Sequence, residues 1–484
     1  MTRKAIIGIL ALSAVVVLFL ATSWIDGAVV RARLARADRS MGTTLPLFAV
    51  VHRQVNSGLF SSTVEVTYEF NDKLFKSMAA ATASAKKTAY SGEAPPSLTL
   101  RHHIQHGPIP GFAMLGLARI DTEVVIPEVA RQELRSSIGT DQPLKIVTVL
   151  GYLGGGTTRI DSPAFTFNDT RNANRIDWRG IKGRLNFTRG LNSQDGNLTL
   201  LGMKILDNKG TTATIGQVRF DYELKRTFKL LYTGKASFTM DRLAIAMPQQ
   251  TGAGNMEMRD LAYNVVTTAS GDYLDMVAKL GVGSLSVATL NSSGVHYDFS
   301  LRHLHGPSYA ALTEKLRGIY AATLNGDGKA PQQILAPFRE FGAIMLEHQP
   351  ELTIEQISIF MPEGAAQMSG KISIPGYAHG DLDSGPMVLL PKIEASIDIA
   401  VDEGFLNRDW GPPSPPASHS TAKARAANAP APPSRLEVMK AQLATLEQQG
   451  FVTRHGSQLS SHLEFRHGAL TVNGKPMGPP GARH

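Results

Sequence analysis

Cysteine is absent from this chain of 484 residues, and tryptophan occurs only three times. Without a thiol, the protein cannot use a cysteine nucleophile, a cysteine-ligated zinc site or an iron–sulfur cluster. A cysteine-free chain also cannot be mispaired in an oxidising compartment, which suits export, although cytosolic proteins can lack cysteine too. The absence of cysteine therefore excludes thiol-dependent sites, and it supports export without establishing it.

Sequence signatures of the common enzyme classes are also missing. The chain has no Gly-x-Ser-x-Gly and no His-Glu-x-x-His motif, which mark many hydrolases and metalloproteases. The glycine-rich segment 151–159, GYLGGGTTR, lacks the Gly-Lys-Ser/Thr of a phosphate loop and the spacing of a dinucleotide fingerprint. We predict a mobile loop between strands there. We predict no catalytic, cofactor-binding or metal-binding residue, and hence a protein that is not an enzyme.

The net charge of +8 is spread along the chain except for one cluster, formed by Arg31, Arg33, Arg36 and Arg39. No basic run is interleaved with aromatic residues, so we predict no nucleic-acid partner. The cluster directly follows a long apolar stretch, and arginines in that position commonly meet lipid head groups.

That apolar stretch, Ala5–Ile25, has no charged side chain and is long enough to cross a bilayer core, which takes about 20 residues. We interpret residues 1–27 as an uncleaved signal anchor and residues 28–44 as a basic juxtamembrane segment. A cleavable signal peptide stays open, because residues 21–23 (ATS) form an acceptable cleavage site. Both flanks are basic, so the positive-inside rule does not decide the orientation.

The region after the anchor has the pattern of a mainly β, α+β fold. Within Thr63–Phe70, Val64, Val66 and Tyr68 alternate with polar residues, as in a half-buried strand. Further short runs, punctuated by glycine and proline and by turns such as Asp195-Gly196, favour a large antiparallel meander. The other predicted strands are Phe48–Asn56, Ser97–His106, Leu144–Leu150, Phe165–Asn168, Ile176–Phe187, Asn197–Leu206, Thr214–Glu223, Tyr232–Ala246, Met256–Ala269, Tyr273–Val287, Val295–His305, Leu352–Phe360, Gln367–Ile374 and Ile393–Val401.

These strands are predicted to form one periplasmic β-rich domain over residues 45–410. One reading divides the domain into two similar meander units, 45–250 and 251–410. The sequences LTLRHHIQHGP at 98–108 and FSLRHLHGP at 299–307 support it, because both run a strand into His-Gly-Pro.

Helical segments and a linker complete the organisation. Helical periodicity covers 307–324 and 331–349, and these helices would cover part of the sheet. The Pro- and Ala-rich residues 411–434 predict an extended linker. Residues 435–484 are predicted to hold a helix to residue 449 and a hairpin at Leu459–Asn473 that docks on the main domain.

The histidines are the residues that first suggest a metal site. If 97–106 is a strand, His102 and His106 share one face about 13 Å apart and His103 lies on the other, so one ion cannot bind all three. His303 and His305 would lie about 6.6 Å apart on one strand face, but the sequence identifies no third ligand. We interpret all five as structural, with no metal.

Several segments together resemble a known family. They are NSGLFSSTVEV at 56–66, LRHHIQHGPIP at 100–110, GVGSLSV at 281–287 and GALTVNGKPM at 468–477. In order and spacing they resemble the YdgA-like family of Gram-negative inner-membrane proteins with a periplasmic domain of unknown function. The resemblance implies a single-pass inner-membrane protein with most of the chain in the periplasm, and it implies no catalytic residues.

Three classes of function stay open. The sequence favours a non-enzymatic, membrane-anchored binding protein for a hydrophobic ligand, such as lipid, or for an envelope protein, because an incompletely covered sheet leaves apolar area exposed. The alternative is an architectural or assembly factor that self-associates, for example as a homodimer. The third class is a cell-envelope hydrolase with an unrecognised site.

Overall fold

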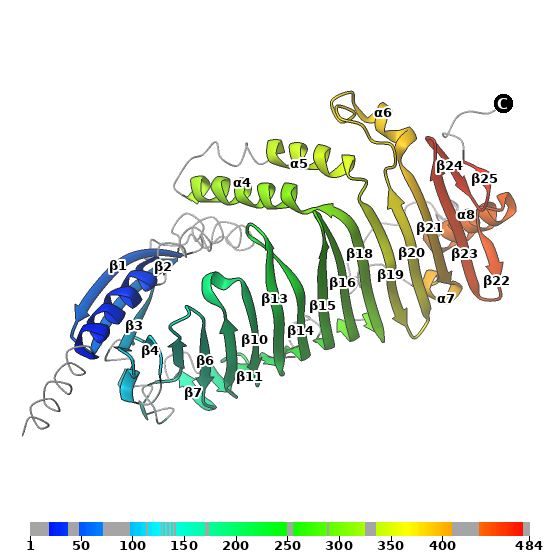
Figure 1. The fold of residues 1–484 in the computed structure, drawn as a ribbon. Helices are drawn as coiled ribbons and strands as arrows, with labels where there is room; N and C mark the ends of the chain where they lie inside the picture. The colour runs from blue at the N-terminus through cyan, green and yellow to red at the C-terminus, as the bar shows by residue number, and fades with distance from the viewer. Residues whose placement is uncertain are drawn as a thin grey trace, which may run out of the picture. The chain divides into compact units, whose positions relative to one another are not determined.

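The computed structural model describes residues 19–36, 48–70, 97–112, 115–126, 142–169, 174–248, 255–287, 290–324, 335–408 and 435–477, with a few single residues between 128 and 139. Within them the fold is mainly β, with 25 strands, antiparallel pairing and few helices, as predicted (Figure 1). The chain divides into two compact units. The first comprises residues 1–254, 264–272 and 305–342, and the second comprises 255–263, 273–304 and 343–484.

The first unit begins with the N-terminal helix (residues 19–36) and a meander in which β1 to β6 pair in chain order. The sheet continues from β6 through β9, β10 and β13 to β14. Its strands are β1 (Phe48–Ser57), β2 (Ser61–Phe70), β3 (Ser97–His106), β4 (Ala118–Val124), β5 (Lys145–Leu150), β6 (Gly156–Ser162), β7 (Phe165–Asp169), β8 (Asn174–Trp178), β9 (Ile181–Phe187), β10 (Ser193–Leu200), β11 (Met203–Leu206), β12 (Thr212–Ile215), β13 (Val218–Phe228) and β14 (Leu231–Ala246).

Three predicted strands of the first unit are each broken into two. Ile176–Phe187 becomes β8 and β9, and the strands predicted at Asn197–Leu206 and Thr214–Glu223 are split in the same way. The breaks line up across the sheet, because Leu201 bonds to Gly180 and Arg179 to Gly202 through backbone N–H groups. Gly180 and Gly202 have φ of +105° and +130°, a backbone that glycine adopts without strain.

Two local predictions in the first unit are wrong. Asp195-Gly196 lies inside β10, and the reversal before it occurs at Thr188–Ser193, where Leu191 has a φ of +60°. The loop predicted over 151–159 ends at Gly155, because Gly156 begins β6, which pairs with β5 and β9. The strand β4 was not predicted, although Ala118, Ile120 and Val124 alternate with charged residues as in a half-buried strand.

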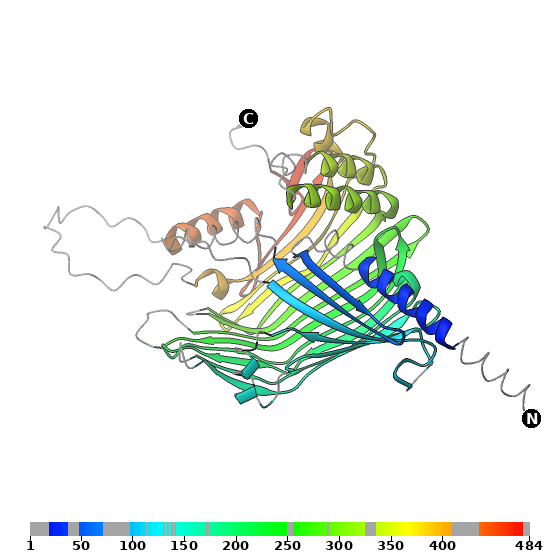
Figure 2. The ribbon, with the colours of Figure 1, turned by 90° about the vertical axis from the view of Figure 1, so that its left-hand side faces the viewer.

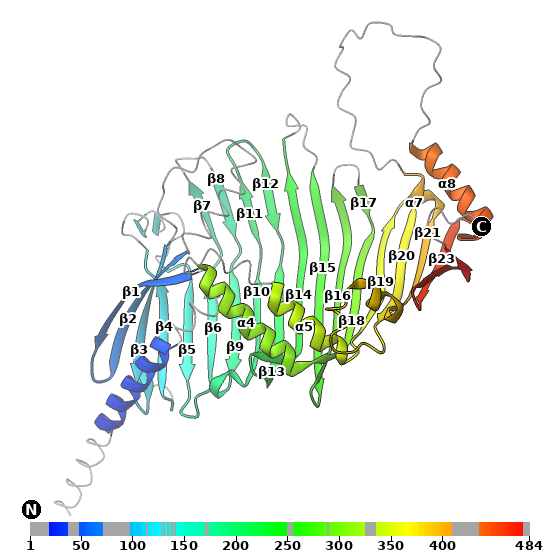
Figure 3. The same cartoon turned by 90° about the horizontal axis from the view of Figure 1, so that it is seen from above.

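The N-terminal helix packs on β2, β3 and β4, and this contact forms the main core of the first unit. Val30 of the helix, Val64 and Val66 of β2, and Ile104 of β3 are at most 1% exposed. The helix lies across these strands (Figure 3). Fully burying a residue of this size contributes roughly 1.5–3 kcal/mol, so this contact is a major source of stability for the N-terminal end of the sheet.

The predicted membrane span overlaps this helix. Residues 5–18 lie outside the described part of the chain, and so do residues 37–44 of the predicted juxtamembrane segment and the predicted linker 411–434. Among the residues that the structure describes, no helix is both long and apolar enough to cross a membrane. Arg31, expected at lipid head groups, donates a hydrogen bond to Ser62 Oγ at 2.8 Å.

The second unit is also a sheet of antiparallel strands. In it β16 pairs with β17 and β18. From β18 the order continues through β19, β20 and β21 to β23, each strand pairing with the next. Its strands are β16 (Tyr273–Val287), β17 (Leu290–Ser292), β18 (Gly294–His305), β19 (Glu351–Met361), β20 (Gly364–Ser373), β21 (Glu394–Asp402), β22 (Thr453–His455), β23 (Gln458–Arg466), β24 (Ala469–Val472) and β25 (Lys475–Pro476).

The other elements in the described residues are the strand β15, the helices α4 to α8 and three 3₁₀ turns. β15 (Met256–Ser270) contributes to both units, as does α5 (Leu335–Glu347), whereas α4 (Gly306–Leu324) lies in the first. The second unit also contains α6 (Pro386–Leu389), α7 (Glu403–Leu406) and α8 (Arg435–Gln449). The 3₁₀ turns are Pro110–Phe112, Arg189–Leu191 and Leu390–Lys392.

Candidate functional site

The histidines of β3 do not form a site together. The strand spans Ser97–His106 as predicted, with His102 and His106 buried on one face and His103 exposed on the other. His102 Nδ1 lies 2.8 Å from Thr122 Oγ1, whereas His103 Nε2 lies 3.3 Å from Glu123 on the opposite side of the sheet. Each imidazole therefore has its own partners.

His106 is held under the N-terminal helix. Its Nδ1 lies 3.0 Å from the carbonyl oxygen of Ser23, and its Nε2 lies 3.1 Å from Ser62 Oγ. Burial lowers the pKa of His106 below its ordinary value of 6.5, and the nearby Arg31 guanidinium adds to this. The imidazole is a neutral part of the helix–sheet contact.

A second buried polar contact joins the same helix to the loop after β5. The Tyr152 hydroxyl donates to Asp26 Oδ2 at 2.9 Å. Burial, with the neighbouring carboxylate, raises the pKa of Tyr152 to about 12. The phenol therefore stays protonated and keeps donating to the carboxylate at neutral pH.

His303 and His305 also have separate partners. His303 has a φ of +57°, so the regular alternation of faces on which their predicted spacing rested ends at this residue. The backbone N–H of His303 donates to Asp275, whereas His305 Nδ1 lies 2.6 Å from Ser308 Oγ. Over the described ranges, no group of three or more acidic, histidine or cysteine residues is placed to hold a metal ion.

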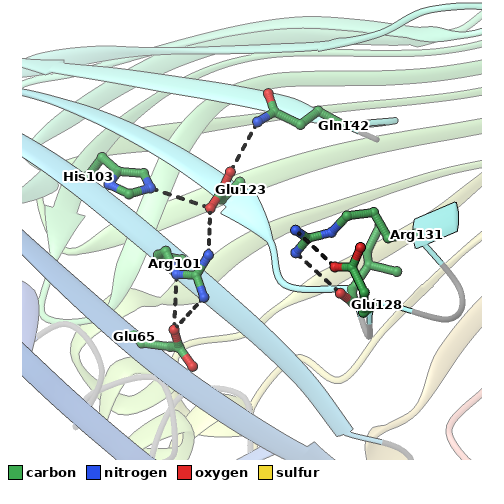
Figure 4. Close-up of polar contacts among 8 residues, drawn as sticks. Glu65, Arg101, His103, Glu123, Glu128, Arg131 and Gln142 are labelled. Carbon is green, nitrogen blue, oxygen red and sulfur yellow. Dashed lines mark hydrogen bonds and ion pairs between the residues drawn. The ribbon is translucent and has the colours of Figure 1, made fainter. Parts of the chain in front are cut away.

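One face of β2–β4 carries a charged network (Figure 4). The Arg101 guanidinium lies between two carboxylates, 3.0 Å from Glu65 and 3.1 Å from Glu123. Gln142 donates to the second oxygen of Glu123. Every donor and acceptor here comes from a strand or its adjoining loop, so the network serves cross-strand pairing.

The opposite face of the same sheet is apolar, and it continues well beyond the N-terminal helix. The register places Leu185, Gly196 and Tyr222 side by side on neighbouring strands, and the pairings above and below repeat the pattern. We call this surface of β6, β9, β10, β13 and β14 the apolar face. Its positions are Gly156, Thr158, Ile160, Ser162, Ile181, Gly183, Leu185, Phe187, Gln194, Gly196, Leu198, Leu200, Val218, Phe220, Tyr222, Leu224, Arg226, Tyr232, Gly234, Ala236, Phe238 and Met240.

Glycines let the larger side chains lie flat on the apolar face. A Cβ at Gly196 would meet Leu185 at 2.7 Å and the Tyr222 ring at 3.0 Å. Likewise, a Cβ at Gly183 would lie 2.7 Å from Leu198. Neighbouring side chains therefore cover the backbone at these glycines, which fits glycine inside a strand where another group approaches closely.

Among the residues that the structure describes, the helices of the first unit leave most of the apolar face uncovered. The N-terminal helix packs on β2–β4, and α4 approaches β13 at its hairpin end, where Gly306 lies against the Phe228 ring. Both helices are drawn with the strands of this unit in Figure 2. Of the large apolar residues on the face, Phe220 is 38% exposed, and Leu198, Leu185 and Phe238 are half-buried. The small number of predicted helices led us to expect an incompletely covered apolar surface. The sequence did not indicate which strands would form it.

Two polar hollows are weaker candidates for a functional site than the apolar face. In the first unit, a hollow of about 620 Å³ is lined mainly by the charged side of the sheet, including Arg184, Asp195 and Glu223. In the second unit, a hollow of about 460 Å³ contains His462, whose Nδ1 lies 2.7 Å from Asp398. The nearby Ser460 and Ser461 hydroxyls donate to backbone carbonyls, so this arrangement does not activate a serine nucleophile.

Comparison with known proteins gives one match. A family model described as "Bacterial protein of unknown function (DUF945)" matches residues 2–480. No curated protein and no solved structure matches the chain.

Proposed function

The chain belongs to this bacterial family of unknown function, and from that premise we propose that it is a membrane-anchored, non-enzymatic protein that binds a hydrophobic ligand on the apolar face. The observation that carries the proposal is the uncovered apolar surface across β6, β9, β10, β13 and β14. Contiguous exposed apolar patches larger than a few hundred Å² are uncommon on soluble monomers and usually mark binding sites.

Anchoring in the inner membrane, with the bulk of the chain in the periplasm, is the second part of the proposal. It is supported by the uncharged stretch 5–25 and by the resemblance to YdgA-like proteins. Ser23 is fully buried, and its hydroxyl donates to the Leu59 carbonyl, so we place the end of the span at residue 22. Residues 5–22 would then reach about 27 Å as a helix, close to the bilayer core of about 30 Å.

This arrangement would hold the first unit beside the lipid. The last residues of the apolar stretch, 19–25, belong to the N-terminal helix, and that helix packs on the same side of the sheet as the apolar face. A ligand taken from the membrane surface would therefore meet the apolar face nearby. The alternative, an architectural protein, would cover the same face with a second copy of the chain.

The absence of cysteine makes a direct test possible, because one introduced thiol labels one position. Phe220→Cys on the apolar face and Thr239→Cys on the opposite side, both exposed, would each carry a polarity-sensitive fluorophore in the full-length protein. We expect phospholipid micelles to shift the emission at position 220 to shorter wavelength and to leave position 239 unchanged. Equal shifts would contradict the proposal, and a shift that depends on protein concentration alone would support self-association.

A further inference from the structure

The apolar face carries a single charged side chain, and it lies at one end. Of the positions that form this face, only Arg226 is charged, whereas the opposite side of the same strands carries Asp195, Asp221, Glu223 and Lys235 among others. Among the positions of the apolar face Arg226 is thus the exception, while Arg242 lies on the same side of β14 beyond Met240, outside the pairing with β13.

Arg226 is placed to present its charge outward. It is exposed near the end of β13, opposite Tyr232 of β14. Its Nη2 donates to the Tyr232 hydroxyl at 2.8 Å, and the guanidinium carbon lies 5.4 Å from the ring centroid. The stacking orients the planar guanidinium, which has five N–H donors in total. Several therefore remain available to an anion, as in bidentate contacts with phosphate.

The dimensions of the apolar face suit an acyl chain that lies along the strand. From Leu224, beside Arg226, to Val218 at the other end, β13 extends six residues, or about 20 Å. The acyl chains of one leaflet span about 15 Å, half of the bilayer core. A flexible chain of methylene groups can follow the side chains along this face, whereas a helix needs ridges and grooves to pack against.

Resting on the function proposed above, we propose that the ligand of the apolar face is a phospholipid with an anionic head group. Its acyl chain lies along β13 from Leu224 towards Val218, and its phosphate binds Arg226 and the Tyr232 hydroxyl. Arg226 therefore determines the preference among head groups, and the apolar residues supply affinity without regard to the head group.

The test uses the full-length protein and two photoreactive lipids with the same diazirine-bearing acyl chain, phosphatidylglycerol and phosphatidylcholine. We expect wild-type protein to be labelled about fivefold more by phosphatidylglycerol, the factor for one arginine near an anionic lipid. Arg226→Gln should remove this preference by lowering phosphatidylglycerol labelling more than phosphatidylcholine labelling, because both lipids carry the phosphate but only phosphatidylglycerol has a net negative charge. Arg226→Lys should retain part of the preference, because it keeps the charge but not the planar donors.

Lys225→Gln is the matched control. Lys225 is the neighbouring residue, also exposed, but lies on the opposite side of the sheet, so the variant makes the same change in net charge. An equal loss of preference in both variants, or no preference in wild-type protein, overturns the head-group assignment. Equal labelling by both lipids within residues 218–224 would still support a hydrophobic ligand on this face, whereas no labelling there contradicts both proposals.

Discussion

The imidazole of His106 donates from Nδ1 to the carbonyl oxygen of Ser23, at 3.0 Å, and so joins β3 to the N-terminal helix. The tautomer follows from this contact, because a carbonyl can only accept. Nε2 must then accept from the Ser62 hydroxyl, and Ser62 in turn accepts from Arg31. The three hydrogen bonds run in one direction from Arg31 to Ser23, and they require a neutral imidazole.

Acid should therefore loosen the N-terminal helix. The pKa of His106 is below 6.5 in the folded protein, so just below that pH the unfolded chain binds a proton that the folded protein does not. The contribution of His106 to stability is fully present above about pH 6.5 and is lost as the pH falls through the window below it. We expect the hydrogen-exchange protection of residues 19–36, corrected for the slower chemical exchange at low pH, to decrease as the pH falls from 7.5 to 5.5.

His103→Gln and His106→Gln provide the comparison for this experiment. His103 is exposed on the opposite side of the sheet, so its replacement should leave the loss of protection intact. His106→Gln removes the titrating group, and protection of the helix should vary less with pH in this variant than in wild-type protein. The same pH dependence in both variants would show that another group controls the helix.

Glycine is required at position 27, although alanine is the better helix former. A Cβ at Gly27 would lie 2.6–2.8 Å from the ring atoms of His106, so the helix would have to move off the sheet. We expect Gly27→Ala to lower the free energy of unfolding by about 1–3 kcal/mol, as overpacking does. For Gly318 in α4, no described atom outside the adjoining backbone of its own helix lies within 4 Å of the Cβ position, and Gly318→Ala should raise stability by roughly 0.5–1 kcal/mol. Urea denaturation of both variants measures the two changes in the free energy of unfolding. A Gly27→Ala variant that is more stable than wild-type protein would contradict the described packing.

Much of the strand pattern could be predicted, because it depends on residues that are close together in the sequence. The alternation around Val64 and Val66 reflects one buried and one solvent-facing side, and the predicted strands Ser97–His106 and Tyr273–Val287 match β3 and β16. Gly196 was assigned to a turn because Asp-Gly is a common turn pair. Tyr222, 26 residues further along the chain, covers that glycine, and this contact is invisible in a local window.

The candidate site was less predictable than the strands. An apolar strand face is the same in sequence whether a helix covers it or not. The N-terminal helix contacts β3 through Ser23 and His106, a pair 83 residues apart, and no periodicity reveals which strands it covers. Arg226 has no distinguishing motif either, and its role emerges only once the register places it on the apolar face.

The proposed orientation in the membrane makes a separate prediction. A reporter active only in the periplasm, such as alkaline phosphatase, should be active when fused after Phe70, the last residue of β2. A reporter active only in the cytoplasm, fused at the same position, should be inactive. Deleting residues 5–18 should abolish alkaline phosphatase activity, because the apolar stretch directs export in this proposal. The reverse reporter pattern would contradict the periplasmic location.

Two isoleucines on the same side of the sheet distinguish an uncovered apolar face from a closed one. Ile104 is 1% exposed beneath the N-terminal helix, whereas Ile160 is half-buried on β6. Ile104→Thr places a hydroxyl in a packed core, and we expect it to lower the free energy of unfolding by about 2–4 kcal/mol. Ile160→Thr should cost about 1 kcal/mol or less, because water already reaches this side chain. Urea denaturation of detergent-solubilised, lipid-free protein would measure both, and added phosphatidylglycerol should increase the cost at Ile160 alone. An equal cost at both positions without lipid would mean that the apolar face is closed, and it would contradict the binding function.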